Sequence, residues 1–157
     1  MSDFQALNVD ASFFVEDGLG ACGAVVRDHN GGFIGACTTP MEHVPDVVSA
    51  EAEAMRQGLL FLQSLGCSKV LIQSDNVIVV DALKNNEGHS LVAAPILNDC
   101  RVLLKEFGKV YLDFCNRESN CVAHELASFG RGNSPTVWAD NPPNFLLKFL
   151  ADDVSVI

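Results

Sequence analysis

Two strand-like segments joined by a tight turn constrain this chain more than any other feature. Residues 21–27, ACGAVVR, are rich in small and β-branched side chains, and residues 33–38, FIGACT, have a similar character. Between them lies DHNGG, residues 28–32, a composition typical of a β-hairpin turn. Because the loosely alternating segment Ala6–Phe14 precedes this hairpin, the sequence predicts three consecutive antiparallel strands.

The rest of the chain alternates helices with strands. Residues 49–65 place apolar side chains on one helical face, and Gly66 follows as a C-terminal cap. The other predicted elements are a strand at Val70–Ile72, helices at Asn76–Lys84 and Ala94–Phe107, a strand at Val110–Cys115, a helix at Ser119–Phe129 capped by Ser119 or Asn120, and an extended tail at 132–157 whose NFLLKFL stretch can form a short helix. This order predicts an α/β fold, with a mixed five-stranded sheet of three antiparallel and then parallel strands, and helices on its faces.

The composition is that of a single globular domain over residues 1–157, with a core at 6–131 and a C-terminal extension at 132–157. Hydrophobic residues make up 48% of the chain and charged residues 19%. No apolar run approaches the ~18 residues of a membrane span, and the first residues lack the features of a secretory signal. The six cysteines form no CxxC motif and no zinc-like cluster, which favours reduced thiols in an intracellular protein of the nucleus or cytoplasm.

The net charge of −10 argues against tight binding to nucleic acid. Phosphate backbones are normally bound by clustered Lys and Arg, and here no basic run is longer than one residue. The charge balance therefore predicts weak binding to any nucleic acid.

One carboxylate stands where a buried strand ends, in KVLIQSDN. Taken alone, this residue, Asp75, could be a helix N-cap and nothing more. Three other polar groups could converge on it: Asp10 in the first strand, Glu51 on the long helix and His124 at the start of a later helix. The functional prediction depends on whether these four side chains meet.

Five motifs, in order, resemble the ribonuclease H type 1 fold, and specifically its reverse-transcriptase-like version abundant in plants. They are LNVDASF, GAVVRDHNGGFIGA, AEAEAMRQGL, VLIQSDN and RESNCVAHELA, and they cover most of residues 6–131. The ending WADNPP, Trp138 to Pro143, is similar to that of the plant members. The resemblance implies a two-metal nuclease that cuts the RNA strand of an RNA–DNA hybrid.

By this resemblance Asp10, Glu51 and Asp75 hold two Mg²⁺ or Mn²⁺ ions, which prefer hard oxygen ligands and clamp the attacking and leaving oxygens. A metal-activated water is then the nucleophile. The alternatives are structural: turn hydrogen bonds for Asp10 and an ordinary first-turn glutamate for Glu51. Glu53 competes with Glu51 but lies ~200° around the helix, so the two cannot share a site.

The fourth position departs from the family pattern. The family motif ends NxxAD, whereas this chain reads NCVAH, so His124 replaces an aspartate. A neutral imidazole is a softer ligand without negative charge, so we expect a weakened second metal site that Mn²⁺ serves better than Mg²⁺. His124 then assists the second metal or product release; the alternative is a cap-region histidine that faces solvent. Glu125 is rotated ~100° and does not substitute.

Ser12, Gly23 and Asn76 lie in matching motifs and are the candidates for substrate contacts, with turn and cap roles as the alternatives. The stretch NNEGHS, where some family members carry a basic protrusion, is short and not basic. His29, His43 and His89 fall in turns or loops and are expected to be solvated.

Two further interpretations remain open. The chain could be a catalytically weakened or inactive member of the fold that binds nucleic acid or a protein partner. It could also be a domain of a larger, retroelement-like parent polypeptide.

Overall fold

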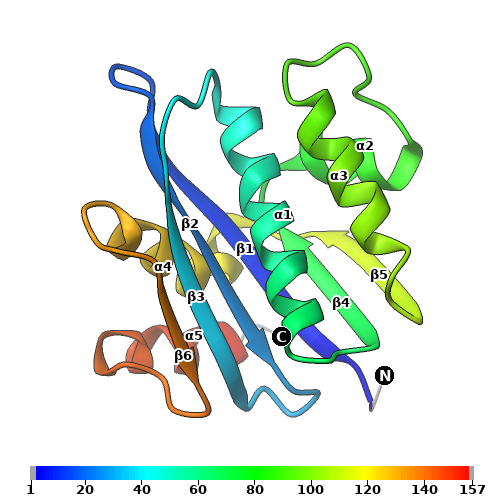
Figure 1. The fold of residues 1–157 in the computed structure, drawn as a ribbon. Helices are drawn as coiled ribbons and strands as arrows, with labels where there is room; N and C mark the ends of the chain where they lie inside the picture. Colours follow the sequence, from blue (N-terminus) through cyan, green and yellow to red (C-terminus); the bar gives the residue numbers. More distant parts are fainter. Residues whose placement is uncertain (1–2, 156–157) are drawn as a thin grey trace.

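The computed structural model describes residues 3–155, and the side chains of 3–152, as a mixed β-sheet with helices on both faces (Figure 1). The strands lie in the order β5-β4-β1-β2-β3-β6. They are β1 Gln5–Phe14, β2 Leu19–Arg27, β3 Phe33–Met41, β4 Lys69–Ser74, β5 Lys109–Phe114 and β6 Thr136–Ala139. The first three strands are antiparallel, and β4 and β5 add in parallel to β1, so the predicted α/β fold and mixed sheet are confirmed.

The helices divide into two layers. Their bounds are α1 Val47–Ser64, α2 Val77–Asn85, α3 Ala94–Leu104, α4 Cys121–Gly130 and α5 Leu147–Ser155, with short 3-10 helices η1 Arg117–Asn120 and η2 Asn144–Leu146. In Figure 1, α1, α2 and α3 cover one face of the sheet, and α4 and α5 lie on the other. Along β1, Leu7 and Val9 face the first layer, so the intervening Asn8 and Asp10 face α4.

The sheet has a sixth strand that the sequence analysis placed in an extended tail. β6 pairs antiparallel with β3, with Trp138 opposite Ala36. The ring of Phe145 lies 4.9 Å from that of Phe129 on α4, and the ring of Trp138 lies 5.5 Å from it, measured between centroids. A four-residue strand is too short for its alternation to be recognised, and its pairing depends on aromatic contacts with α4 and η2.

The predicted cap of the fourth helix is correct in position but not in contact. Asn120 is the N-cap residue of α4, but its side chain makes no capping hydrogen bond, and Asn116 caps the preceding η1 by accepting from the N–H of Ser119 at 2.9 Å. The buried Asn120 donates to the carbonyl of Val9 at 2.9 Å and accepts from Asn8 at 3.0 Å. These tertiary hydrogen bonds replace the capping hydrogen bond that local preference predicts for the Asn120 side chain.

The six cysteines all lie within the described residues, and no disulfide joins any two of them. No helix in the described part of the chain combines the length and apolar character needed to cross a bilayer.

Candidate metal centre

Two of the predicted carboxylates stand side by side because the parallel ladder between β1 and β4 ends just before them. Its last paired residues are Val9 and Ser74, so Asp10 and Asp75 are the next residues on their strands. Asp75 is followed at once by α2, whose N-terminus is capped by the side-chain oxygen of Asn76. The chain therefore turns away immediately after Asp75 and leaves its carboxylate at the sheet edge.

The third carboxylate is brought in by the close packing of α1 on β1. A Cβ atom on Gly58 would come within 2.5 Å of Val9, so this glycine allows the helix to approach the strand. Glu51 lies seven residues earlier, two turns away on the same helical face, and therefore points toward the sheet. Glu53 is turned away and binds Arg56 at 2.7 Å, as the helical spacing predicted.

Asp10, Glu51 and Asp75 form a compact acidic cluster. One carboxylate oxygen from each residue lies within 4.8 Å of those of the other two, with Asp10 and Glu51 buried and Asp75 partly buried. Burial, followed by the charge of Asp75, raises the pKa of Asp10 to about 6. Burial, followed by the charges of Asp10 and Asp75, raises the pKa of Glu51 to about 9.

This cluster fits a divalent cation. The Oε2 atom of Glu51 is buried and has no hydrogen-bond partner among the described residues. Buried carboxylates that repel one another and leave an oxygen unsatisfied are stabilised by a hard cation, for which carboxylate oxygen is the preferred ligand. The three side chains form an oxygen donor set of the kind that Mg²⁺ or Mn²⁺ binds.

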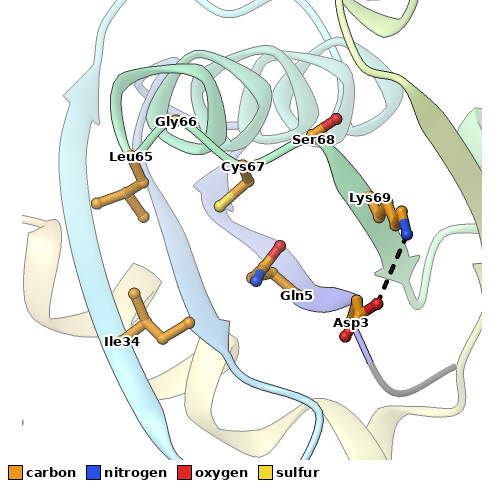
Figure 2. A pocket seen from close by; sticks show the side chains of 8 residues that line it. All are labelled: Asp3, Gln5, Ile34, Leu65, Gly66, Cys67, Ser68 and Lys69. Atoms are coloured by element: carbon orange, nitrogen blue, oxygen red, sulfur yellow. Dashed lines mark ion pairs between the residues drawn. The ribbon is translucent and has the colours of Figure 1, made fainter.

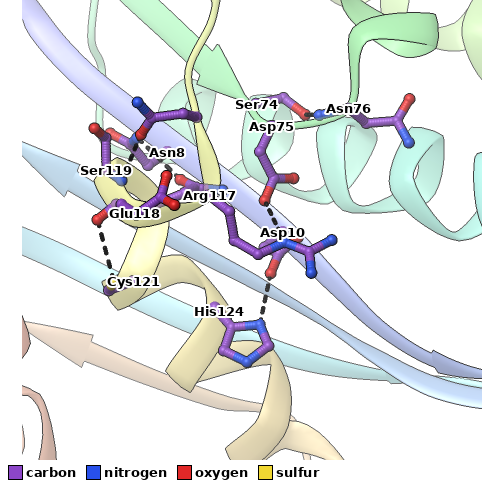
Figure 3. Close-up of polar contacts among 12 residues, drawn as sticks. Asn8, Asp10, Ser74, Asp75, Asn76, Arg117, Glu118, Ser119, Cys121 and His124 are labelled. Carbon is purple, nitrogen blue, oxygen red and sulfur yellow. Dashed lines mark hydrogen bonds and ion pairs between the residues drawn. The ribbon is translucent and has the colours of Figure 1, made fainter.

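His124 on α4 contacts the cluster through one of its members, Asp10. Its Nδ1 lies 3.1 Å from Oδ2 of Asp10, although the side chain is 55% exposed (Figure 3). It is thus not a simple solvent-facing residue, in contrast to His29, His43 and His89, which are exposed as expected. The imidazole supplies a hydrogen bond to Asp10 where the family pattern would supply a fourth carboxylate.

The sequence analysis missed one neighbour of the cluster. The Nε of Arg117, in η1, lies 4.0 Å from Oδ2 of Asp75, with the arginine side chain 88% exposed (Figure 3). An exposed guanidinium beside buried carboxylates offsets part of their charge while keeping donors free for an anion. Arg117 is the first residue of the motif RESNCVAHELA, but a single arginine outside any basic run does not by itself indicate a functional residue.

The three candidate substrate contacts lie in different surroundings. Asn76 caps α2, the alternative role considered for it. Ser12 is half-buried on β1, two residues beyond Asp10 and on the same face. Gly23 is buried under α4, where a Cβ would meet the carbonyl oxygen of Ala123 at 2.5 Å. A packing role explains this glycine, and a substrate contact from Gly23 stays a prediction.

We expect Gly23→Ala to lower the free energy of unfolding by about 1–3 kcal/mol, because the added methyl group forces α4 away from β2. Urea unfolding measures this change, with Ser12→Ala as the control from the neighbouring strand. Unchanged stability with weaker binding of nucleic acid would contradict the packing role and support a substrate contact.

One cavity lies well away from the acidic cluster. This cavity of about 410 Å³ is lined by Asp3, Gln5, Ile34, Leu65, Gly66, Cys67, Ser68 and Lys69 (Figure 2). It lies at the start of β1 and β4 and the end of α1, and thus at the opposite end of the three elements that carry the carboxylates.

Comparison with known proteins gives one family and one fold. A sequence model described as reverse transcriptase-like matches residues 8–130. The search of curated proteins found no match.

Among solved structures, RNase H1 from the archaeon Halobacterium salinarum is 19% identical, covering 80% of this chain and 96% of its own, with a TM-score of 0.75. The N-terminal RNase H domain of Rv2228c from Mycobacterium tuberculosis, solved as a fusion with maltose-binding protein, is 18% identical, covering 82% and 94%, with a TM-score of 0.75. LC11-RNase H1 in complex with an RNA/DNA hybrid is 17% identical, covering 81% and 96%, with a TM-score of 0.73. At these identities the likeness establishes the fold.

Proposed function

The chain belongs to the reverse transcriptase-like family, and from that premise we propose that it is a metal-dependent endoribonuclease that cleaves the RNA strand of RNA–DNA hybrids. The observation that carries the proposal is the convergence of Asp10, Glu51 and Asp75, with a buried, unsatisfied oxygen on Glu51. A solved structure of the same fold carries an RNA/DNA hybrid, which makes this substrate the natural choice.

The three carboxylates are proposed to hold Mg²⁺ or Mn²⁺, which supplies Lewis-acid stabilisation of phosphate charge and an acidified water. The side chains have separate roles around it. His124 fixes the orientation of Asp10 through their 3.1 Å contact, and its exposure lets it pass a proton to solvent or to the leaving oxygen. Arg117, exposed beside Asp75, offers donors to the approaching phosphate.

The second candidate is a non-catalytic module of the same fold that binds nucleic acid or protein. It is favoured by the histidine at the fourth position and by the net charge of −10. The two candidates differ in one measurable property, because only the nuclease requires the carboxylates to engage a divalent ion.

The experiment is a cleavage assay on a hybrid labelled on its RNA strand, with Mg²⁺, Mn²⁺ or EDTA. We expect internal cleavage of the RNA with either ion, faster with Mn²⁺, and none in EDTA. Double-stranded RNA and double-stranded DNA are the substrate controls. An intact hybrid at high enzyme concentration, with no divalent-ion effect on the unfolding temperature, would reject the nuclease and favour the binding module.

We expect His124→Asp to tighten the binding of Mg²⁺ by about 10-fold, because an anionic oxygen replaces a neutral imidazole beside Asp10. Isothermal titration calorimetry measures the affinity and the number of ions bound, independently of activity. Glu125→Gln, on the adjacent position of α4, is the control and should leave Mg²⁺ affinity unchanged. Equal Mg²⁺ affinity in His124→Asp and wild type would contradict a metal-site role for this position.

A further inference from the structure

The arginines of this acidic chain divide by what their guanidinium groups contact. Three of them bind groups within the fold: Arg27 lies buried beside Asn8, Arg56 pairs with Glu53, and Arg101 binds Asn98 and the carbonyl oxygens of Ala82 and Glu87. The other two stand at opposite ends of α4, Arg117 in η1 before it and Arg131 directly after it. The arginines least involved in the fold therefore flank the helix that carries His124.

Helix α4 packs along strand β1, and successive residues along the helix and its two flanking residues contact successive residues along the strand. Three contacts join them in the same order along both elements: Asn120 with Asn8, His124 with Asp10, and Arg131 with Phe14. Ser12, the predicted substrate contact, is the residue of the same β1 face between the second and third contacts. We call this line of contacts the α4–β1 seam; Asp10 of the acidic cluster lies on it.

Arg131 is held in a way that leaves its donors free. Its guanidinium carbon lies 4.1 Å from the ring centroid of Phe14, which is half exposed. Among the described side chains, those of residues 3–152, the guanidinium has no salt-bridge partner, and its buried Nε has no hydrogen-bond partner. A guanidinium held over an aromatic ring by cation–π attraction can still donate its outer N–H groups to a phosphate in a bidentate pair.

The position of Arg131 along the α4–β1 seam suits contact with a nucleic-acid strand that crosses the acidic cluster. Arg131 follows His124 by seven residues, which is about 10 Å along a helix. A phosphate of the same strand can therefore lie beside Arg131 when the attacked linkage lies beside His124. A phosphate at that separation from the attacked linkage would meet Arg131, while the acidic residues elsewhere repel the backbone.

We infer that Arg131, held over the ring of Phe14, contacts a backbone phosphate of the nucleic-acid strand that lies across the acidic cluster, near the attacked linkage. The inference rests on the proposed function and adds a binding residue to it. It also explains how a chain of net charge −10 can hold a polyanion, by placing one pre-oriented arginine where the strand passes.

The test compares hybrid binding by Arg131→Gln with binding by Lys148→Gln. Lys148 is a matched control, since its Nζ lies 4.9 Å from the ring centroid of Phe149, on α5 and outside the α4–β1 seam. Binding of a fluorescein-labelled RNA–DNA hybrid is followed by anisotropy in Ca²⁺ at several salt concentrations, with gel analysis showing that the hybrid stays intact. Thermal unfolding of each variant shows that it is folded.

We expect Arg131→Gln to weaken binding about 5- to 10-fold at low salt and to reduce the slope of log affinity against log salt by about 1. Arg131→Lys should keep the slope but lose affinity, because it retains the charge without the planar fork. Phe14→Leu should lose affinity less than Arg131→Gln, and it carries the test if Arg131→Gln does not fold.

Two results would overturn the inference, and they differ from one another. If wild type binds the hybrid and Arg131→Gln matches Lys148→Gln in affinity and salt slope, Arg131 is only a clamp between α4 and the β1–β2 hairpin, and the proposed function stands. If wild type binds no hybrid even at low salt, the proposed function fails and the phosphate contact fails with it.

Discussion

Asp10→Asn is expected to reduce hybrid cleavage by at least about 100- to 1,000-fold, the scale on which a single pre-oriented electrostatic group contributes. Asp10 lies between the other members of the cluster: its carboxylate contacts His124 at 3.1 Å and lies within 4.8 Å of oxygens of Glu51 and Asp75. The amide has nearly the same shape but carries no charge, so it removes an anionic oxygen from the donor set and leaves the packing intact. Single-turnover cleavage of labelled hybrid in Mn²⁺ measures the effect.

The control is Asp113→Asn. Asp113 lies on β5, paired with Gln73 of the neighbouring strand β4, and is exposed and outside the cluster. It should cleave at the wild-type rate. Because Asp10→Asn removes one of several mutually repelling charges, its unfolding temperature in EDTA should equal or exceed that of wild type. Wild-type cleavage by a folded Asp10→Asn protein would remove the basis of the nuclease proposal.

The elements that the sequence predicted correctly are those with strong local signals. The hairpin around residues 28–32 and the long amphipathic helix at 49–65 need only turn chemistry and periodicity, and the structure has both. The conclusion that Glu51 and Glu53 cannot share a site came from helical spacing, which is also local. The convergence of the four polar side chains came from the resemblance, because no single-sequence signal reports where distant segments meet.

The misses share one physical cause, which is that tertiary contacts decided the outcome. Asn120 has a strong preference for helix caps, but its buried amide bonds with Asn8 and the carbonyl of Val9 instead. Strand β6 depends on pairing with β3 and on the rings of Phe129 and Phe145. Exposed arginines follow no periodic pattern in a sequence, so the role of Arg117 becomes visible only in the structure, where it lies beside Asp75.

The metal-free cluster should make stability fall as pH rises, which is opposite to the usual behaviour of paired carboxylates. The pKa of Glu51 is raised from 4.5 to about 9, and that of Asp10 from 3.8 to about 6. Between its unfolded and folded pKa each group binds a proton only in the folded state, so each stabilises the fold fully below its unfolded pKa and loses that contribution up to its folded pKa. The free energy of unfolding in EDTA should therefore decline from about pH 4 to about pH 9.

Glu51→Gln isolates the larger part of this effect. The amide stays neutral at every pH, so the variant should be more stable than wild type in EDTA at pH 7, by up to about 3 kcal/mol, and its stability should vary little above pH 6. Mn²⁺ binds the ionised carboxylates, so it should stabilise wild type and reverse the order of the two proteins, with little effect on the variant. Urea unfolding at pH 5 to 9, with EDTA or Mn²⁺, measures both responses, and Glu125→Gln is the control. A wild-type stability that rises with pH in EDTA would show that burial does not raise the pKa of Glu51. Equal Mn²⁺ stabilisation of both proteins would show that Glu51 is not a metal ligand.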